Sequence, residues 1–127
     1  MNTQLVNAVI EQLGGDSDDR EEVNQTLEDV ANNGADAGYS GFTYYADTCE
    51  FFTKNKSLIV ELVKEYAEEF GQDAISVIAG WNCLDDDTET RDEIERAIYG
   101  TPEQGDVTVQ NALAWFALEE VAREETH

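Results

Sequence analysis

Residues 56–71 read KSLIVELVKEYAEEFG, and this stretch decides the fold class. Its large apolar residues recur every three or four positions, which is the spacing of one face of an α-helix. Gly71 follows as a stop signal, because glycine readily takes the left-handed conformation found just after helix ends. The stretch therefore predicts a helix over 56–70 that directs these side chains into the core: Leu58, Ile59, Leu62, Val63, Tyr66 and Phe70.

The same apolar spacing recurs on both sides of this stretch. It predicts further helices over 3–13, over 18–31 with Ser17 as N-cap, and over 47–53 with Asp47 as N-cap. It also predicts a short helix capped by Asp73, a helix from Thr88 or Thr90 to Gly100, and a final helix capped by Asp106. Between 35 and 46 the helical spacing disappears and glycines and aromatic residues dominate, which is typical of a loop or a short strand pair. We expect a single compact all-α domain over 1–127, with about six or seven helices and an irregular segment near 35–46.

The charge of the chain limits its function. Twenty-nine acidic residues stand against seven basic ones, which gives a formal net charge of −22 over 127 residues. Phosphate would be repelled by such a surface, so ordinary nucleic-acid binding is excluded. Twenty-two charges correspond to about 37 Å of DNA duplex, which is close to the diameter of a compact domain of this length, about 36 Å. The charge therefore favours a protein that takes the place of nucleic acid on a basic partner, provided that its carboxylates gather on one side.

The acidic residues form four clusters along the chain, the first over 16–29, the second over 61–69, the third over 85–95 and the fourth over 119–125. In the second cluster, Glu61, Glu65 and Glu68 fall within about 60° of one another around the predicted helix, so they form one row. The fourth cluster, near 119–125, belongs to a chain end that we expect to fray. A solvated acidic face is the alternative interpretation for any single cluster. The residues predicted to bind a partner are Asp16, Asp18, Asp19, Glu21, Glu22, Glu61, Glu65, Glu68, Glu69, Asp85, Asp86, Asp87, Glu89, Asp92, Glu93, Tyr44 and Tyr45.

The acidic runs do not have the spacing of a calcium loop. An EF-hand loop needs oxygen ligands at positions 1, 3 and 5, glycine at 6 and glutamate at 12. A loop that starts at Asp16 has Leu27 at position 12, and one that starts at Asp85 has Arg96 there. The sequence therefore predicts no EF-hand. Loose binding of a divalent cation at 85–87 stays open, as does adaptation of the surface to high salt.

Half of the twelve aromatic residues lie within the segment 39–52. One interpretation is that they hold an irregular segment against the core. The other is that Tyr44 and Tyr45 remain available to a protein partner, since exposed tyrosines often anchor interfaces.

Catalytic signatures are missing from the sequence. The single histidine is His127, so a histidine-based catalytic triad or a histidine-ligated metal site is not expected. No glycine-rich phosphate loop with its lysine occurs either. We expect no enzymatic activity, no cofactor and no metal.

The composition favours a soluble protein of the cytoplasm. No stretch approaches the ~20 apolar residues that cross a membrane, and the first residues do not have the pattern of a signal peptide. Cys49 and Cys83 are expected to be reduced, buried thiols.

Two stretches resemble known proteins: 38–52, which reads GYSGFTYYADTCEFF, and 111–124, which reads NALAWFALEEVARE. They are similar to small acidic proteins encoded by phages, prophages and plasmids, which have no assigned activity. In size and charge the chain also resembles the acidic DNA mimics by which mobile elements block restriction enzymes or CRISPR complexes. This resemblance implies a non-enzymatic inhibitor that competes for the basic DNA- or RNA-binding channel of a host defence complex. The alternative is an adaptor or antitoxin-like protein that binds one partner through 39–52, with the acidity serving solubility.

Overall fold

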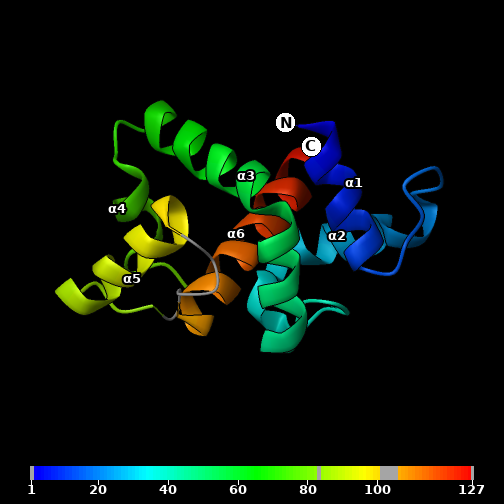
Figure 1. Cartoon of the computed structure of the whole chain (residues 1–127). Helices are drawn as coiled ribbons and strands as arrows, with labels where there is room; N and C mark the ends of the chain where they lie inside the picture. The colour runs from blue at the N-terminus through cyan, green and yellow to red at the C-terminus, as the bar shows by residue number, and fades with distance from the viewer. Residues whose placement is uncertain (1, 83, 101–105, 127) are drawn as a thin grey trace.

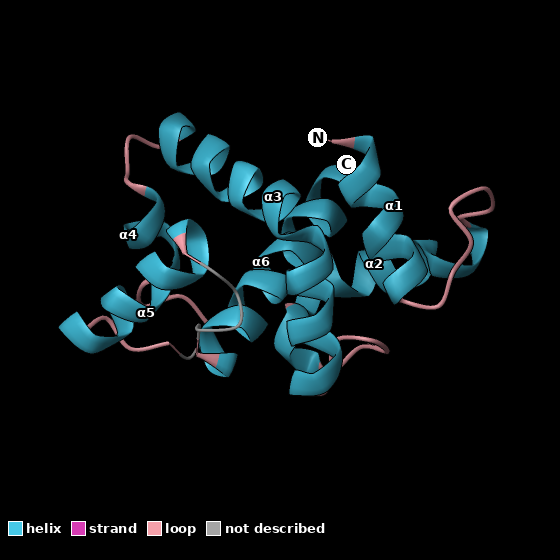
Figure 2. Cartoon of the chain, in the orientation of Figure 1, coloured by secondary structure: helices cyan, strands magenta, loops and turns pink. Residues whose placement is uncertain are grey.

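The computed structural model describes residues 2–82, 84–100 and 106–126, and their regular structure is helical throughout (Figure 2). No strand occurs in these ranges, so the prediction of an all-α fold is confirmed. The predictions about Cys83 and His127 lie outside the described residues, as does Pro102, which the sequence places in the loop after Gly100. The elements are α1 (Thr3–Gln12), α2 (Glu21–Asn33), the short 3-10 helix η1 (Ala35–Ala37), α3 (Tyr45–Glu69), α4 (Ala74–Ile78), α5 (Thr88–Tyr99) and α6 (Val107–Glu125).

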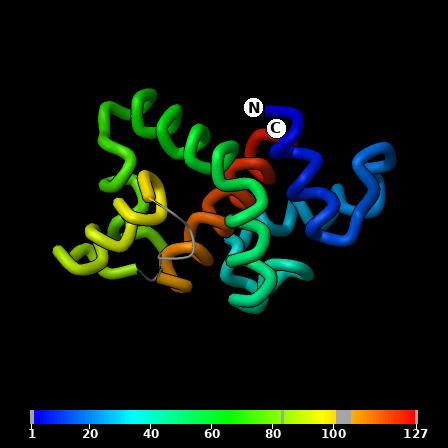
Figure 3. Tube along the Cα trace, in the orientation of Figure 1, coloured from blue at the N-terminus to red at the C-terminus, as the bar shows by residue number. Residues whose placement is uncertain are grey.

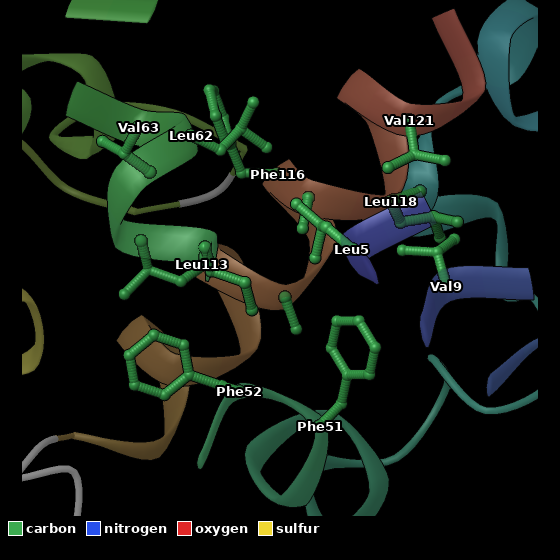
Figure 4. Close-up of a cluster of buried hydrophobic side chains, with 14 of the residues drawn as sticks. Leu5, Val9, Phe51, Phe52, Leu62, Val63, Leu113, Phe116, Leu118 and Val121 are labelled. Atoms are coloured by element: carbon green, nitrogen blue, oxygen red, sulfur yellow. The ribbon is translucent and has the colours of Figure 1, made fainter. Parts of the chain in front are cut away.

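Helix α6 runs through the middle of the molecule and contacts α1, α2, α3, α5 and η1 (Figure 1). A helix with so many neighbours must be apolar on most of its circumference, and the sequence NALAWFALEEVA provides this. Asp106 caps the helix as predicted, since its carboxylate accepts the Thr108 N–H at 2.7 Å. Figure 4 shows the resulting core, in which Leu113 and Phe116 of α6 meet side chains from α1 and α3.

Helix α3 joins two helices that the sequence predicts separately, over 47–53 and 56–70. It spans 25 residues but is interrupted by a kink at Asn55, whose φ of −117° and ψ of 21° are not helical. The Asn55 amide donates to the Phe51 carbonyl at 3.0 Å and so occupies a helix acceptor near the kink. The bend lets both halves of α3 follow the core, as Figure 3 shows. Asp47 lies in the first turn of α3 and is not its N-cap, which corrects that prediction.

Helix α2 begins three residues later than predicted, and Ser17 does not cap it. The Ser17 hydroxyl instead donates to Glu11, 3.3 Å away. Gly15 packs so closely against Val23 that an added Cβ would lie 2.3 Å from a Val23 methyl carbon. This close packing folds the chain back on itself and delays the helix. At α5 the predicted start at Thr88 is right, but its cap is Asp87, which accepts the Thr90 N–H at 2.7 Å.

The irregular segment before α3 is held to the core by side-chain contacts, and no strand pair forms there. Phe42 is fully buried, and its carbonyl accepts the Trp115 indole N–H at 2.8 Å. Gly41 has a φ of +82° and lies so close to Gln12 that a Cβ would clash with the Gln12 carbonyl oxygen. Only glycine fits such a position. Tyr39 is half-buried against the same core.

The structure corrects the predicted burial of two side chains, Cys49 and Phe70. Cys49 is a free thiol but is only half-buried, with its Sγ 3.6 Å from the Val107 carbonyl oxygen. Phe70, predicted to point inward, is 57% exposed because it follows the last residue of α3.

None of the helices in the described ranges is long and apolar enough to cross a membrane.

Candidate partner-binding surface

Each of the seven basic residues makes an interaction within the chain. Five form ion pairs, each with a different carboxylate: Arg20 with Glu125, Lys54 with Glu50, Arg91 with Asp86, Arg96 with Glu93 and Arg123 with Glu120. Lys56 donates to the Gly100 carbonyl, and the Lys64 ammonium lies over the Tyr99 ring, 4.9 Å from its centre. The net negative charge is therefore carried by the carboxylates that form no ion pair with these seven residues.

Several carboxylates that the sequence places in the binding site have a structural role. Asp16 accepts the Asp18 N–H at 2.9 Å, and Asp19 accepts the Glu21 N–H at 3.2 Å, so both shape the turn before α2. Asp87 caps α5, and this hydrogen bond lowers the pKa of its carboxyl. Asp86 and Glu93 are paired with arginines. These five are the weakest candidates for partner contacts, because a partner would compete with the interactions that they already make.

The acidic row of α3 has no such role. Glu61, Glu65, Glu68 and Glu69 are exposed, and their side chains form no hydrogen bond or ion pair with any described residue. We call these four residues the α3 acidic face. Lys64, the one cation within the row, points to Tyr99 on α5. The sequence-based prediction of a carboxylate row is thus matched by an unneutralised helix face.

The spacing of the α3 acidic face resembles that of phosphates. A helix rises 1.5 Å per residue, so Glu61 and Glu69 are separated by about 12 Å along the axis. Three intervals over this length give one carboxylate per about 4 Å, against about 3.4 Å per phosphate along one strand of DNA. Flexible side chains can absorb the difference. The row therefore presents negative charge at nearly the linear density of one nucleic-acid strand.

Two hollows flank the α3 acidic face. The first lies between α1 and α3, and Glu61 and Glu65 stand at it together with Asn2 and Leu58. The second, which we call the α3–α6 cleft, is lined by Tyr66, Glu69, Phe70, Glu120, Arg123 and Glu124. This cleft joins the second and fourth acidic clusters, which the sequence alone could not place together.

The fourth acidic cluster does not fray as predicted. The Glu119 carboxylate accepts the Ala35 N–H at 2.8 Å, and Glu125 pairs with Arg20. Glu120 is only 7% exposed and pairs with Arg123 at 3.0 Å. The pKa of Glu120 is raised, chiefly because the carboxyl is buried. The positive charge of Arg123 opposes this shift, whereas the nearby carboxylates of Glu124, Glu119 and Glu69 add to it. These contacts hold the last turns of α6 against the rest of the fold.

The remaining predicted residues lie elsewhere. Asp16, Asp18 and Asp19 of the first cluster lie in the turn between α1 and α2, on the opposite side of the molecule from α5, which carries most of the third cluster (Figure 1). The other members of the first cluster lie on α2. Asp85, Glu89 and Glu93 share a hollow with Asp106, while Asp92 is exposed on α5. The described residues hold no group of three or more side chains placed to bind a metal ion. The carboxylates thus do not form one continuous surface, and the α3 acidic face is the best-defined part.

Tyr44 and Tyr45 are both accessible, at 70% and 49% exposure. They lie at the start of α3, between the buried residues Phe42 and Thr48 in the sequence. The two tyrosines therefore form a second, chemically different candidate surface.

The fold and these surfaces define an acidic all-α domain. Over residues 2–126 the chain matches the family described as Domain of unknown function (DUF7222), and it belongs to that family. No curated protein matches the chain. No solved structure matches it either.

Proposed function

We propose that the protein binds a basic nucleic-acid-binding protein through the α3 acidic face and thereby competes with DNA or RNA for that partner. The observation that supports this proposal is the contrast between the engaged cations and the free carboxylates. All seven basic side chains interact within the chain, whereas Glu61, Glu65, Glu68 and Glu69 have no partner among the described residues. A basic channel would supply that partner.

The mechanism is electrostatic competition. Each carboxylate of the α3 acidic face pairs with a lysine or arginine that otherwise holds a phosphate. The net charge of −22 accelerates encounter with a positive surface, and salt weakens both the encounter and the complex. No bond is made or broken. A restriction or CRISPR complex is the target class that the resemblance to DNA mimics suggests.

The test compares two variants with the same change in net charge. In the α3-neutral variant, Glu61, Glu65 and Glu68 are each replaced by Gln. In the loop-neutral control, Asp18→Asn is combined with Glu21→Gln and Glu22→Gln, which are exposed near the start of α2. Both variants gain three units of charge, so only the position of the lost carboxylates differs.

The assay is capture from a bacterial lysate rich in defence systems, elution with a salt gradient and identification by mass spectrometry. The dissociation constant of the purified partner is then measured for each variant. Exposed ion pairs contribute about 0.2–1 kcal/mol each, so the loss of three predicts binding about 3- to 150-fold weaker for the α3-neutral variant. The loop-neutral control should bind nearly as tightly as the wild type. Equal binding by both variants would exclude the α3 acidic face as the site.

A second candidate is supported by the exposure of Tyr44 and Tyr45. In this case the protein is an adaptor that binds its partner through an aromatic surface, and the acidity serves solubility. Replacement of both tyrosines by serine would then abolish binding, the α3-neutral variant would bind normally, and the complex would survive high salt. The two proposals thus predict opposite results in the same assay.

A further inference from the structure

The α3–α6 cleft combines an exposed aromatic surface with carboxylates. Phe70 lies against Tyr66, with 4.6 Å between ring centres and 40° between ring planes. Tyr66 in turn meets Phe116 of α6 edge-on at 5.4 Å, which fixes its position against the core. Phe70 is therefore held by a rigid support although 57% of its own surface is exposed. An exposed ring held in this way offers a platform for a flat ligand group.

The charge of the cleft is strongly negative. Glu69, Glu120 and Glu124 line it with Arg123 as the only cation among the lining residues, which leaves two formal negative charges in excess. Arg123 is half-exposed, while the Glu120 side chain is only 9% exposed. Burial raises the pKa of Glu120, and the neighbouring carboxylates add to this effect, so a further positive charge would relieve their mutual repulsion.

We propose that the cleft accepts an arginine side chain of the basic partner, with the guanidinium plane against Phe70 and its N–H groups directed to the exposed Glu69 carboxylate. Charge complementarity selects a cation, and the aromatic platform selects a planar one. Guanidinium stacks on aromatic rings and donates to carboxylates in pairs, whereas the lysine ammonium is a compact, strongly hydrated charge. This inference rests on the proposed function, because it names the residue type by which the partner is held at one end of the α3 acidic face.

The direct test is an NMR titration of the full chain with the blocked tripeptide Gly-Arg-Gly. Peptides of the same length with lysine or citrulline in the centre serve as controls, since citrulline keeps the shape of arginine but has no charge. We expect saturable shift changes confined to the amides of 66–70 and 119–124. Arginine should bind more tightly than lysine, and citrulline should not bind.

Variants then separate the contributions of the ring and the charge. Phe70→Leu keeps an apolar side chain but removes the ring, and should weaken arginine binding about two- to fivefold. Glu69→Gln should weaken it without changing the fold. Tyr44→Ala, which removes an exposed ring at the other end of α3, should have no effect. Unfolding curves for each variant verify that the fold is retained.

The outcomes distinguish this inference from the proposed function. Shift changes spread over all acidic surfaces, equal binding of lysine and arginine, or full binding by Phe70→Leu would each overturn the arginine site. If Phe70→Leu and Glu69→Gln bind the captured partner like the wild type while the α3-neutral variant does not, the cleft is excluded and the proposed function stands. If arginine binds in the cleft but the α3-neutral variant still binds the partner, the proposed function fails and the cleft stands.

Discussion

The α3 acidic face should cost the protein stability, and Glu65 allows this to be measured. Glu65 has like-charged neighbours at three helical positions, namely Glu61, Glu68 and Glu69. Residues three or four apart on a helix are close enough for like charges to repel. Glu65→Gln removes all three repulsions. It loses no attraction of this kind, because Lys64 is its sequence neighbour and lies over Tyr99.

The expected gain follows from these pairs. Each like-charge pair costs about 0.2–0.5 kcal/mol, so Glu65→Gln should raise the free energy of unfolding by about 0.6–1.5 kcal/mol. Glutamine and glutamate have nearly equal helix propensity, so the exchange itself adds little. For a domain of this size the gain corresponds to a rise in Tm of about 2–7 °C.

The assay is urea unfolding followed by circular dichroism in low salt and in 1 M NaCl. Because the Debye length is about 3 Å at 1 M, shorter than the spacing of the pairs, the gain should nearly vanish there. Glu28→Gln on α2 is the control, since Glu28 has no charged residue three or four positions away. Glu65→Gln that fails to stabilise the protein in low salt, or that stabilises it no more than Glu28→Gln, would refute the reasoning.

Four further predictions concern the fold. Asp106→Ala removes the cap of α6 and should lower the free energy of unfolding by about 1 kcal/mol in urea titrations, whereas Asp106→Asn should retain most of it. Leu113→Ala empties a fully buried position where α6 meets α3 and should cost about 2–5 kcal/mol by the same measurement. The raised pKa of Glu120 means that its carboxyl favours the folded state below its unfolded pKa, and that this contribution is lost as pH rises through the folded value. Glu120→Gln should therefore gain stability relative to the wild type between pH 4 and pH 7, and a gain that falls over this range would contradict the assigned cause. Asp87→Asn should lose stability relative to the wild type at neutral pH, and this loss should shrink only as the pH falls below the ordinary aspartate pKa of 3.8, because the pKa of Asp87 is lowered.

Apolar spacing was sufficient to predict the helices and most of their buried faces. Leu62 and Leu113 are buried as expected, because a stripe of large apolar residues on one helix face is stable when it packs against the core. The caps Asp73 and Asp106 were also predictable from local chemistry. The break between the predicted helices 47–53 and 56–70 coincides with the kink at Asn55, but the sequence did not show that the two segments form one bent element. The same holds for the start of α2, which is set by the contact of Gly15 with Val23.

The candidate surface could be predicted only where it lies on one helix. Glu61, Glu65 and Glu68 share a face because of the helix period alone. Their lack of basic neighbours became clear only when Lys64 was found over Tyr99 of another helix. The α3–α6 cleft was missed for a similar reason. The periodicity places Phe70 on the buried stripe, but the position lies past the end of α3, and nothing in the sequence signals that Glu120 would be buried beside it.

The measurement that tests the central claim most directly is a competition between this protein and DNA for one captured basic partner. A fluorescent DNA duplex is bound to the partner, and the unlabelled protein is added at several fixed duplex concentrations. If the α3 acidic face substitutes for phosphate, the protein displaces the duplex completely, and the protein concentration that gives half-displacement rises in proportion to the duplex concentration. Half-displacement then requires a much higher concentration of the α3-neutral variant than of the loop-neutral control. A complex that contains protein, partner and duplex together, unaffected by the loss of Glu61, Glu65 and Glu68, would contradict the account.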